Sequence, residues 1–411
     1  MSLKGIHQLS MTQQKNLQGP VARRAPSSRS AINTSAILKA LTKEATELGL
    51  DAISAGSVAK RAGLTSGAIY SRYENNDEML IALWQNVVAP VFGAHCKETI
   101  AAIVSTNPSA QDSNLLAQIE KPNHILGLGA EFIVVAQRNE VIGEVVVAEV
   151  SKLLSDAGLN SSSTPIQRAG VAIGASLAIG AILRSFITGS NPGLRLIVSG
   201  IHNAYVDAKP TTAARKSLTP KPIRSDTQNP LRDALIDATA EVMSKTGFTG
   251  ATISRIARKS DITSGSIYNF YADKESLMND SVSELMRTTQ RQNLDSKKVA
   301  SSLHKPNFGL TDSFDFGLIP DRRTWLRFRQ ECIIATRHHK KTHKEMKKVI
   351  TELNESMTQS FPHLSPAVVN LVSMGEQAIG YGYSSLFGYT NLFDKCDFDA
   401  IMVQVAKQNS L

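Results

Sequence analysis

The chain has little cysteine and no apolar run long enough to cross a membrane. Its three cysteines, Cys96, Cys332 and Cys396, lie far apart in 411 residues, and none forms a C-x-x-C pair. That usage excludes a disulfide framework and a cysteine-based zinc site, and it is typical of a reducing cytoplasm. The most apolar run, residues 169–183, is too short to span a bilayer, and the N-terminus lacks a signal-peptide core. We therefore expect a cytoplasmic protein with no membrane partner.

Sequence signatures of enzymes are also missing. The chain has no G-x-S-x-G motif, no Walker-type loop, no zinc-peptidase helix and no dinucleotide fingerprint. His339 and His343 are four residues apart, but they lie among lysines with no carboxylate or cysteine close by in the sequence. We interpret them as part of a solvated helix end or a phosphate-contacting patch. The expectation is a protein with no catalytic residues, no cofactor and no metal.

Positive charge is concentrated in two segments. Residues 1–34 and 208–229 together hold ten lysines and arginines and one aspartate, which accounts for the whole net charge of +9. Both segments are rich in polar residues and contain proline, so we expect a flexible basic arm over 1–34 and a basic linker over 208–229. Basic arms suit a polyanion such as DNA, whose phosphates they neutralise, although merely solvated segments are the alternative.

The linker separates two halves that resemble each other. Shifting the sequence by 198 residues places T-S-G-A-I-Y (65–70) on T-S-G-S-I-Y (263–268), with Gly49 on Gly247. A weaker match, with an offset of 200, places residues 131–134 on 331–334. We interpret the chain as a duplicated unit with diverged copies. Apolar residues recur at spacings of three and four and strand signals are sparse, which predicts an all-α fold.

In each copy a short helix, a tight turn and a second short helix follow the glycine. Gly63 and Asp261 are the predicted left-handed turn residues. Hydroxyl residues stand where the helices should begin and are the predicted N-caps: Ser54 and Thr65 in the first copy, Thr252 and Thr263 in the second. This pattern predicts a helix-turn-helix, whose second helix enters the major groove of double-stranded DNA by its N-terminal end.

The second helix, expected over residues 66–73 in the first copy, has an inner and an outer face. Ile69 and Tyr73 should pack inward, while Tyr70 should point outward, where its phenol can donate to a phosphate. The predicted DNA-contacting residues are Ser54, Thr65, Ser66, Gly67, Ala68, Tyr70, Ser71 and Arg72 in the first copy, and Thr252, Thr263, Ser264, Gly265, Ser266, Tyr268 and Asn269 in the second. Because Arg favours guanine and Asn favours adenine, we predict two unlike half-sites.

Both units resemble the DNA-binding domain of the tetracycline-repressor (TetR) family over about 45 residues each. The family tends to carry a lysine where the second copy has Lys274, which implies a phosphate contact there, and where the first copy has Asn76. Asp261 is a second departure, because the family has glycine at the turn. The resemblance implies helix-turn-helix domains over 35–84 and 230–282, each followed by a helical regulatory domain, over 85–207 and 283–411.

The resemblance further implies that each regulatory domain dimerises through its last two helices, expected over 165–187 with 194–206 and over 366–387 with 398–407. The first of these is rich in small residues, which suits close helix packing, although a plain core helix is the alternative. The halves could pair within one chain as a covalent pseudo-dimer, or two chains could form a homodimer with four reading heads. A linker of 22 residues, averaging roughly 26 Å, does not forbid half-sites roughly 34–36 Å apart.

The family's regulatory domains bind small-molecule effectors, and the second half is the richer in aromatic residues. If one half binds an effector we expect it there, at Trp325, Phe328, Tyr381 and Tyr383, although core packing is the alternative. The predicted function is a ligand-responsive transcriptional repressor. A DNA-binding architectural or scaffold protein without a switch is the alternative, and an interaction module with vestigial helix-turn-helix units is a third class.

Overall fold

The computed structural model describes residues 28–105, 113–211, 222–302 and 311–408, and these ranges contain helices and no strand. The all-α prediction is confirmed. The predicted arm lies mostly outside the described residues, but its last part does not: the first helix begins at Ser28.

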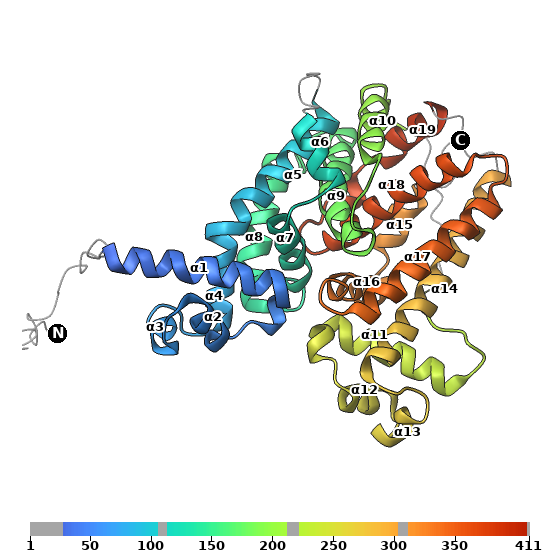
Figure 1. Ribbon diagram of the computed structural model, residues 1–411. Coiled ribbons are helices and arrows are strands. Elements are labelled where there is room, and N and C mark those ends of the chain that lie inside the picture. Colours follow the sequence, from blue (N-terminus) through green and yellow to red (C-terminus); the bar gives the residue numbers. More distant parts are fainter. Residues whose placement is uncertain (1–27, 106–112, 212–221, 303–310, 409–411) are drawn as a thin grey trace, which may run out of the picture.

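The first half begins with a helix-turn-helix domain and continues into a bundle of longer helices (Figure 1). Its elements are α1 (Ser28–Leu48), α2 (Ala55–Ala62), α3 (Ser66–Tyr70), α4 (Asn76–Leu83), α5 (Ala89–Val104), α6 (Ser113–Glu120), α7 (His124–Val135), α8 (Glu140–Asp156), α9 (Pro165–Thr188) and α10 (Leu194–Val206). A π-helical turn, Trp84–Val88, joins α4 to α5 without a break.

The second half has the same order of elements. They are α11 (Pro230–Gly250), α12 (Ile253–Ser260), α13 (Ser264–Tyr268), α14 (Lys274–Ser302), α15 (Asp312–Leu318), α16 (Arg323–Ala335), α17 (Lys340–Ser360), α18 (Pro366–Ser385) and α19 (Phe398–Gln408). The long helix α14 stands where the first half has α4 and α5. The repeat found in the sequence thus corresponds to a repeated order of helices.

Local sequence sets the ends of the two longest regulatory helices. In α9, Thr164 caps the helix in a capping box with Gln167, and Pro165 occupies the first position. In α18, Ser365 accepts from the amide of Val368, and Pro366 again comes first. The observed bounds of α9, α10, α18 and α19 lie within two residues of the predicted ones.

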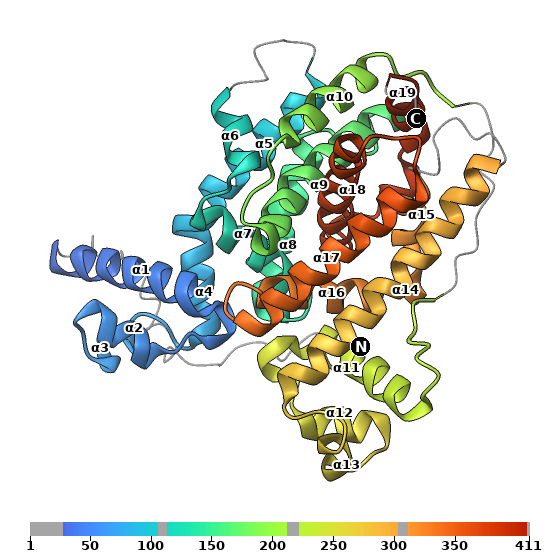
Figure 2. The same cartoon turned by 45° about the vertical axis from the view of Figure 1, so that its right-hand side comes forward.

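Helices α9 and α18 pack along each other and bring the two halves together (Figure 2). Gly180 and Gly382 lie at the closest point: a Cβ on Gly180 would be 1.6 Å from the carbonyl oxygen of Ala378, and one on Gly382 1.8 Å from that of Ser176. Helices α10 and α19 also pack together beside this pair. The last two helices of each half therefore form one four-helix group. The small residues of α9 are what permits the close approach.

Both described ends of the predicted linker are held by hydrogen bonds. Thr211 donates to Asp397 through its amide, at 3.0 Å, and its hydroxyl, at 2.9 Å. At the other end, Thr227 donates twice to Asp233, and the side chain of Ile223 is buried. Residues 212–221 lie outside the described part of the chain. Residues 222–229 are therefore docked on the second half and are not a free coil.

Two helical stretches are long and apolar enough to cross a membrane by length and composition alone, Asn76–Val104 and Pro165–Thr188. In the second, 89% of the apolar window is buried inside the protein, as in the core helix of a globular fold.

Candidate nucleic-acid interface

The two helix-turn-helix domains project from the body of the molecule. Figures 1 and 2 show α2 with α3 at the left and α12 with α13 at the bottom of both views, each away from the four-helix group. We call residues 28–84 the first head and residues 230–282 the second head.

All four predicted N-caps are confirmed. Ser54 accepts from the amide of Ser57 at 3.2 Å, and Thr65 from Ala68 at 3.3 Å. In the second head, the corresponding amides are those of Arg255, at 3.3 Å from the Thr252 hydroxyl, and Ser266, at 3.1 Å from that of Thr263. These caps satisfy amides that would otherwise lack partners at the helix starts, and they fix where α3 and α13 begin.

The turns also have the predicted geometry. Gly63 ends α2 with φ of 68° and Asp261 ends α12 with φ of 55°, both in the left-handed region. Asp261 is one of the two non-glycine residues with positive φ in the described chain. Aspartate tolerates this conformation better than most residues, so the second head keeps the turn without glycine.

The second helix of each unit separates an inner from an outer face as predicted. Ile69 and Ile267 are fully buried, while the tyrosine that follows each of them is exposed: 59% for Tyr70 and 57% for Tyr268. Tyr73 and Tyr271 are buried below them. The exposed tyrosines are the last residues of α3 and α13, about one helical turn from the capped N-termini.

Helices α3 and α13 are shorter than predicted, ending at Tyr70 and Tyr268. Residues 71–72 form a turn, and the Arg72 guanidinium folds back to the carbonyl oxygen of Ala68 at 3.0 Å. The prediction that Arg72 reads a base is not tested by this arrangement, which gives the side chain an internal partner. Ser66, Gly67 and Ser71 in the first head, and Gly265 and Asn269 in the second, are exposed, whereas Ala68, Ser264 and Ser266 are half-buried.

Lys274 has a structural partner that the sequence did not reveal. Its ammonium donates to the carbonyl oxygen of Phe248 at 2.9 Å and lies 5.0 Å from the centre of the Phe248 ring. Burial lowers the pKa of this lysine. At the equivalent position, Asn76 donates to the carbonyl oxygen of Ile53 at 3.1 Å. In both heads this residue therefore bonds the backbone of its own domain.

Sequence reasoning missed one pair of exposed cations. Lys60 and Arg258 occupy the same position in α2 and α12, and both are exposed. Their neighbours Arg61 and Lys259 are paired internally, with Glu44 and Glu47 and with Glu241. A comparison of the two copies at the offset of 198 would have found the shared charge.

Two buried glutamates lie where the first head meets the second half. Glu131, in α7, accepts from the amide of Leu50 in the first head at 2.7 Å and pairs with Arg337 of the second half. His338 lies beside it, and its ring faces Gly49, where a Cβ would be 2.9 Å away. Burial opposes the charge of Glu131, but Arg337 and His338 outweigh it and hold the pKa below its usual value.

The equivalent residue of the second half is Glu331, in α16. It accepts from the Nε of Arg138 of the first half at 2.6 Å, and Arg138 also donates to Asp51 of the first head at 2.7 Å. The Arg138 guanidinium faces Gly247, where a Cβ would be 2.6 Å away. The second oxygen of Glu331 is buried without a hydrogen-bond partner, and burial raises the pKa of this carboxyl to about 7 against the pull of Arg138.

The histidine-rich segment is part of this contact, so its interpretation as a solvated or phosphate-binding patch is wrong. His339 stacks on Phe248 of the second head with ring centres 4.0 Å apart, and His343 bonds the carbonyl oxygen of Ile187 in α9 at 3.0 Å. Within the described ranges, no group of three or more His, Cys, Asp or Glu side chains could hold a metal ion.

The second half contains a cavity of about 150 Å³ between α14, α16, α17 and α18. Three of the four predicted effector-binding aromatics, Trp325, Tyr381 and Tyr383, line it. Phe328 does not: its side chain is fully buried in the hydrophobic core. For Phe328 the core-packing alternative is the one observed.

Two capped short helices joined at a tight turn, with an exposed, hydroxyl-bearing second helix, define a helix-turn-helix DNA-binding domain. Residues 235–280, in the second head, match the family model described as bacterial regulatory proteins, tetR family. The HTH-type transcriptional regulator BetI of Paraburkholderia phytofirmans is 24% identical over 140 residues, which cover 33% of this chain and 69% of that regulator. These similarities support a DNA-binding transcriptional regulator whose second head is of the TetR type.

Proposed function

We propose that the chain is a cytoplasmic, ligand-responsive transcriptional repressor that binds one bipartite operator through both heads. The observation that carries this proposal is the geometry shared by α3 and α13. Each has a capped N-terminus, an exposed first turn and an exposed tyrosine, the features that the match to residues 235–280 connects with DNA binding in the second head.

The packing of α9 on α18 supports a covalent pseudo-dimer. The family resemblance implies that dimerisation uses the last two helices of each regulatory domain. Here those helices of the two halves meet within one chain, at Gly180 and Gly382. A surface that would receive a second chain in a homodimer is thereby occupied by the other half. We therefore propose one chain for each operator.

The crossed contacts of Glu131 and Glu331 support coupling between the regulatory domains and the heads. Each joins α7 or α16 to the opposite half, next to Gly49 or Gly247 inside a head. A ligand that shifted α16 would move Arg337 and His338, and with them the first head. We propose that such a shift changes the spacing of α3 and α13 and lowers operator affinity.

The experiment is a selection of bound sequences from a random duplex pool by the full-length chain at a stated salt concentration, followed by measurement of stoichiometry. We expect a site with two unlike halves bound by one chain. A symmetric palindrome bound by two chains would contradict the pseudo-dimer, and no enrichment at low salt would contradict DNA binding itself.

The selected duplex then tests the two tyrosines. Replacing both, as Tyr70→Phe with Tyr268→Phe, removes two donors to phosphate and should weaken binding by about tenfold or more, at unchanged stability. Tyr205→Phe, on α10 and away from the heads, is the matched control. Equal affinity of the double variant and the control would remove the role of these phenols.

A further inference from the structure

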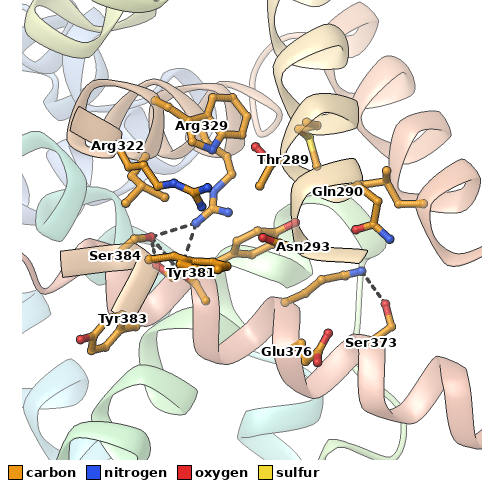
Figure 3. A pocket seen from close by; sticks show the side chains of 18 of the residues that line it. Thr289, Gln290, Asn293, Arg322, Arg329, Ser373, Glu376, Tyr381, Tyr383 and Ser384 are labelled. Atoms are coloured by element: carbon orange, nitrogen blue, oxygen red, sulfur yellow. Dashed lines mark hydrogen bonds between the residues drawn. The ribbon is translucent and has the colours of Figure 1, made fainter. Parts of the chain in front are cut away.

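The cavity in the second half contains a cation with no acidic partner. Arg329 projects from α16 into the cavity, where Figure 3 shows its guanidinium above Tyr381. One terminal nitrogen donates to the carbonyl oxygen of Gly380 at 3.1 Å and to the Ser384 hydroxyl at 3.0 Å. Its Nε is buried without a hydrogen-bond partner. Within the described chain no carboxylate forms an ion pair with this arginine.

Other donors around the same cavity are also unsatisfied. The indole nitrogen of Trp325 and the amide nitrogen of Gln290 are buried without partners, and both residues line the cavity. Asn293 Oδ1, an acceptor on another lining residue, is also buried without a hydrogen-bond partner. Buried polar groups are normally hydrogen-bonded, because each unmade bond costs about 1–3 kcal/mol. An excess of donors beside a partly buried cation is complementary to an anion that accepts several hydrogen bonds.

A second arginine adds to the positive potential. Arg322 lines the cavity close to Arg329, and burial together with the charge of Arg329 lowers its pKa to about 10. The acidic member of the lining is Glu376 of α18, so the positive side of the cavity is the side formed by α16. An anionic group would therefore be held against α16.

The rest of the lining combines apolar and aromatic side chains with hydroxyl and amide groups, and the size of the cavity limits the ligand. Met286, Phe316, Leu326 and Tyr381 are among the lining residues. A cavity of about 150 Å³ holds a molecule the size of benzene. The Arg329 guanidinium, which lies 4.9 Å from the centre of the Tyr381 ring, presents a planar fork that matches a carboxylate.

Resting on the function proposed above, we propose that the effector is a small carboxylate with a compact apolar body, bound by Arg329. The carboxylate accepts hydrogen bonds from the unsatisfied nitrogens of Arg329 and Trp325, and the apolar body fills the space beside Tyr381. The site is connected to both halves of the molecule. Ser384 and Gly380 belong to α18, which packs on α9, and α16 leads directly to Arg337 at the contact with Glu131.

The test measures binding of two probe carboxylates, benzoate and hexanoate, to the full chain by calorimetry and by the shift in melting temperature. Benzamide, a neutral molecule of the same shape as benzoate, is the control ligand. We expect at least one carboxylate to bind and to raise the melting temperature, with benzamide at least tenfold weaker. Equal binding of benzoate and benzamide, or binding of neither carboxylate, would overturn the proposal.

Variants locate the site. Arg329→Gln should weaken carboxylate binding at least tenfold, and Arg329→Lys, which keeps the charge, should restore part of it. Arg327→Gln, which removes an exposed arginine of the same helix, should bind as the unaltered chain does. If Arg329→Gln fails to fold, Trp325→Phe, which removes a single donor, should still weaken binding severalfold. Unchanged affinity in the folded members of the set would contradict the site.

Operator binding separates this proposal from the one on which it rests. If the ligand-free chain binds its selected duplex and no carboxylate binds the protein, only the ligand class is wrong. If a carboxylate binds at Arg329 and no duplex is ever bound, the regulatory function is wrong and the site remains. If both proposals hold, a carboxylate that binds through Arg329 weakens duplex binding by the unaltered chain.

Discussion

The two halves share an order of helices but differ in how they use the same positions. Glu131 and Glu331 occupy equivalent places in α7 and α16, and each pairs with an arginine of the opposite half. Glu131 also accepts an amide hydrogen bond from the first head, whereas one oxygen of Glu331 has no partner. The pKa of the first carboxyl is held low and that of the second is raised. Duplicated positions thus keep their contact geometry while their energetics diverge.

The largest expected effect comes from removing the charge of Glu131. Glu131→Gln leaves Arg337 buried beside an uncharged amide, and breaking a buried pair in this way costs about 3–5 kcal/mol. Chemical denaturation at pH 7 measures the loss in the free energy of unfolding. Glu144→Gln, which alters an exposed glutamate of α8, should change it by less than about 0.5 kcal/mol. Similar values for the two variants would show that the pair is not a structural contact.

The next largest loss in the free energy of unfolding should come from a substitution at the contact of α9 with α18. A methyl group at Gly382 would overlap the Ser176 carbonyl oxygen, a backbone atom that cannot turn away, so Gly382→Ala should cost about 3 kcal/mol. Gly380→Ala, two residues earlier in α18, meets no atom within 4 Å and should stabilise the helix by up to about 1 kcal/mol. Chemical denaturation measures the free energy of unfolding of both variants. Equal values for Gly382→Ala and Gly380→Ala would contradict the close packing of α9 on α18.

The raised pKa of Glu331 predicts a dependence of stability on pH. With a pKa of about 7 in the folded chain, against 4.5 for the ordinary group, the folded state binds more protons between these two values. The free energy of unfolding should therefore fall, by about 2–3 kcal/mol, as the pH rises from 4.5 to 7. Glu331→Gln should flatten this slope, while Glu131→Gln should not. An unchanged slope in Glu331→Gln would assign the titration elsewhere.

The smallest effect concerns Lys274. Lys274→Met removes the hydrogen bond to Phe248 and should lower the free energy of unfolding by about 1 kcal/mol. The salt dependence of duplex binding should stay the same, because the ammonium is held by its own domain. A decrease of about one in the slope of log affinity against log salt would instead place this lysine on a phosphate.

Local features of the heads were predictable from sequence because neighbouring residues determine them. The caps Thr65 and Thr263, the turn residue Asp261 and the outward Tyr70 and Tyr268 each follow from spacing within a few residues. The boundaries of α9 and α18 were predictable for the same reason, since proline and a hydroxyl cap mark their starts.

Contacts between the halves were not predictable, because they join residues about two hundred positions apart. Nothing in the segments around Arg337 and Arg138 indicates that these side chains will meet Glu131 and Glu331. The family resemblance implies a phosphate contact for Lys274, and its sequence neighbours give no sign of the hydrogen bond to the Phe248 carbonyl. Phe328 was grouped with the cavity aromatics because sequence does not tell which face of α16 points into the cavity.

The contact of α9 with α18 lies within one chain, and this changes the mass action of assembly. Subunits of an ordinary dimer separate on dilution, so their operator occupancy depends on the square of a small free concentration. Segments of one chain meet at an effective concentration set by the connecting residues, whatever the number of molecules in the cell. The pairing of these halves therefore does not depend on the number of copies, and under the function proposed above the occupancy of a bipartite site would depend on the first power of the protein concentration.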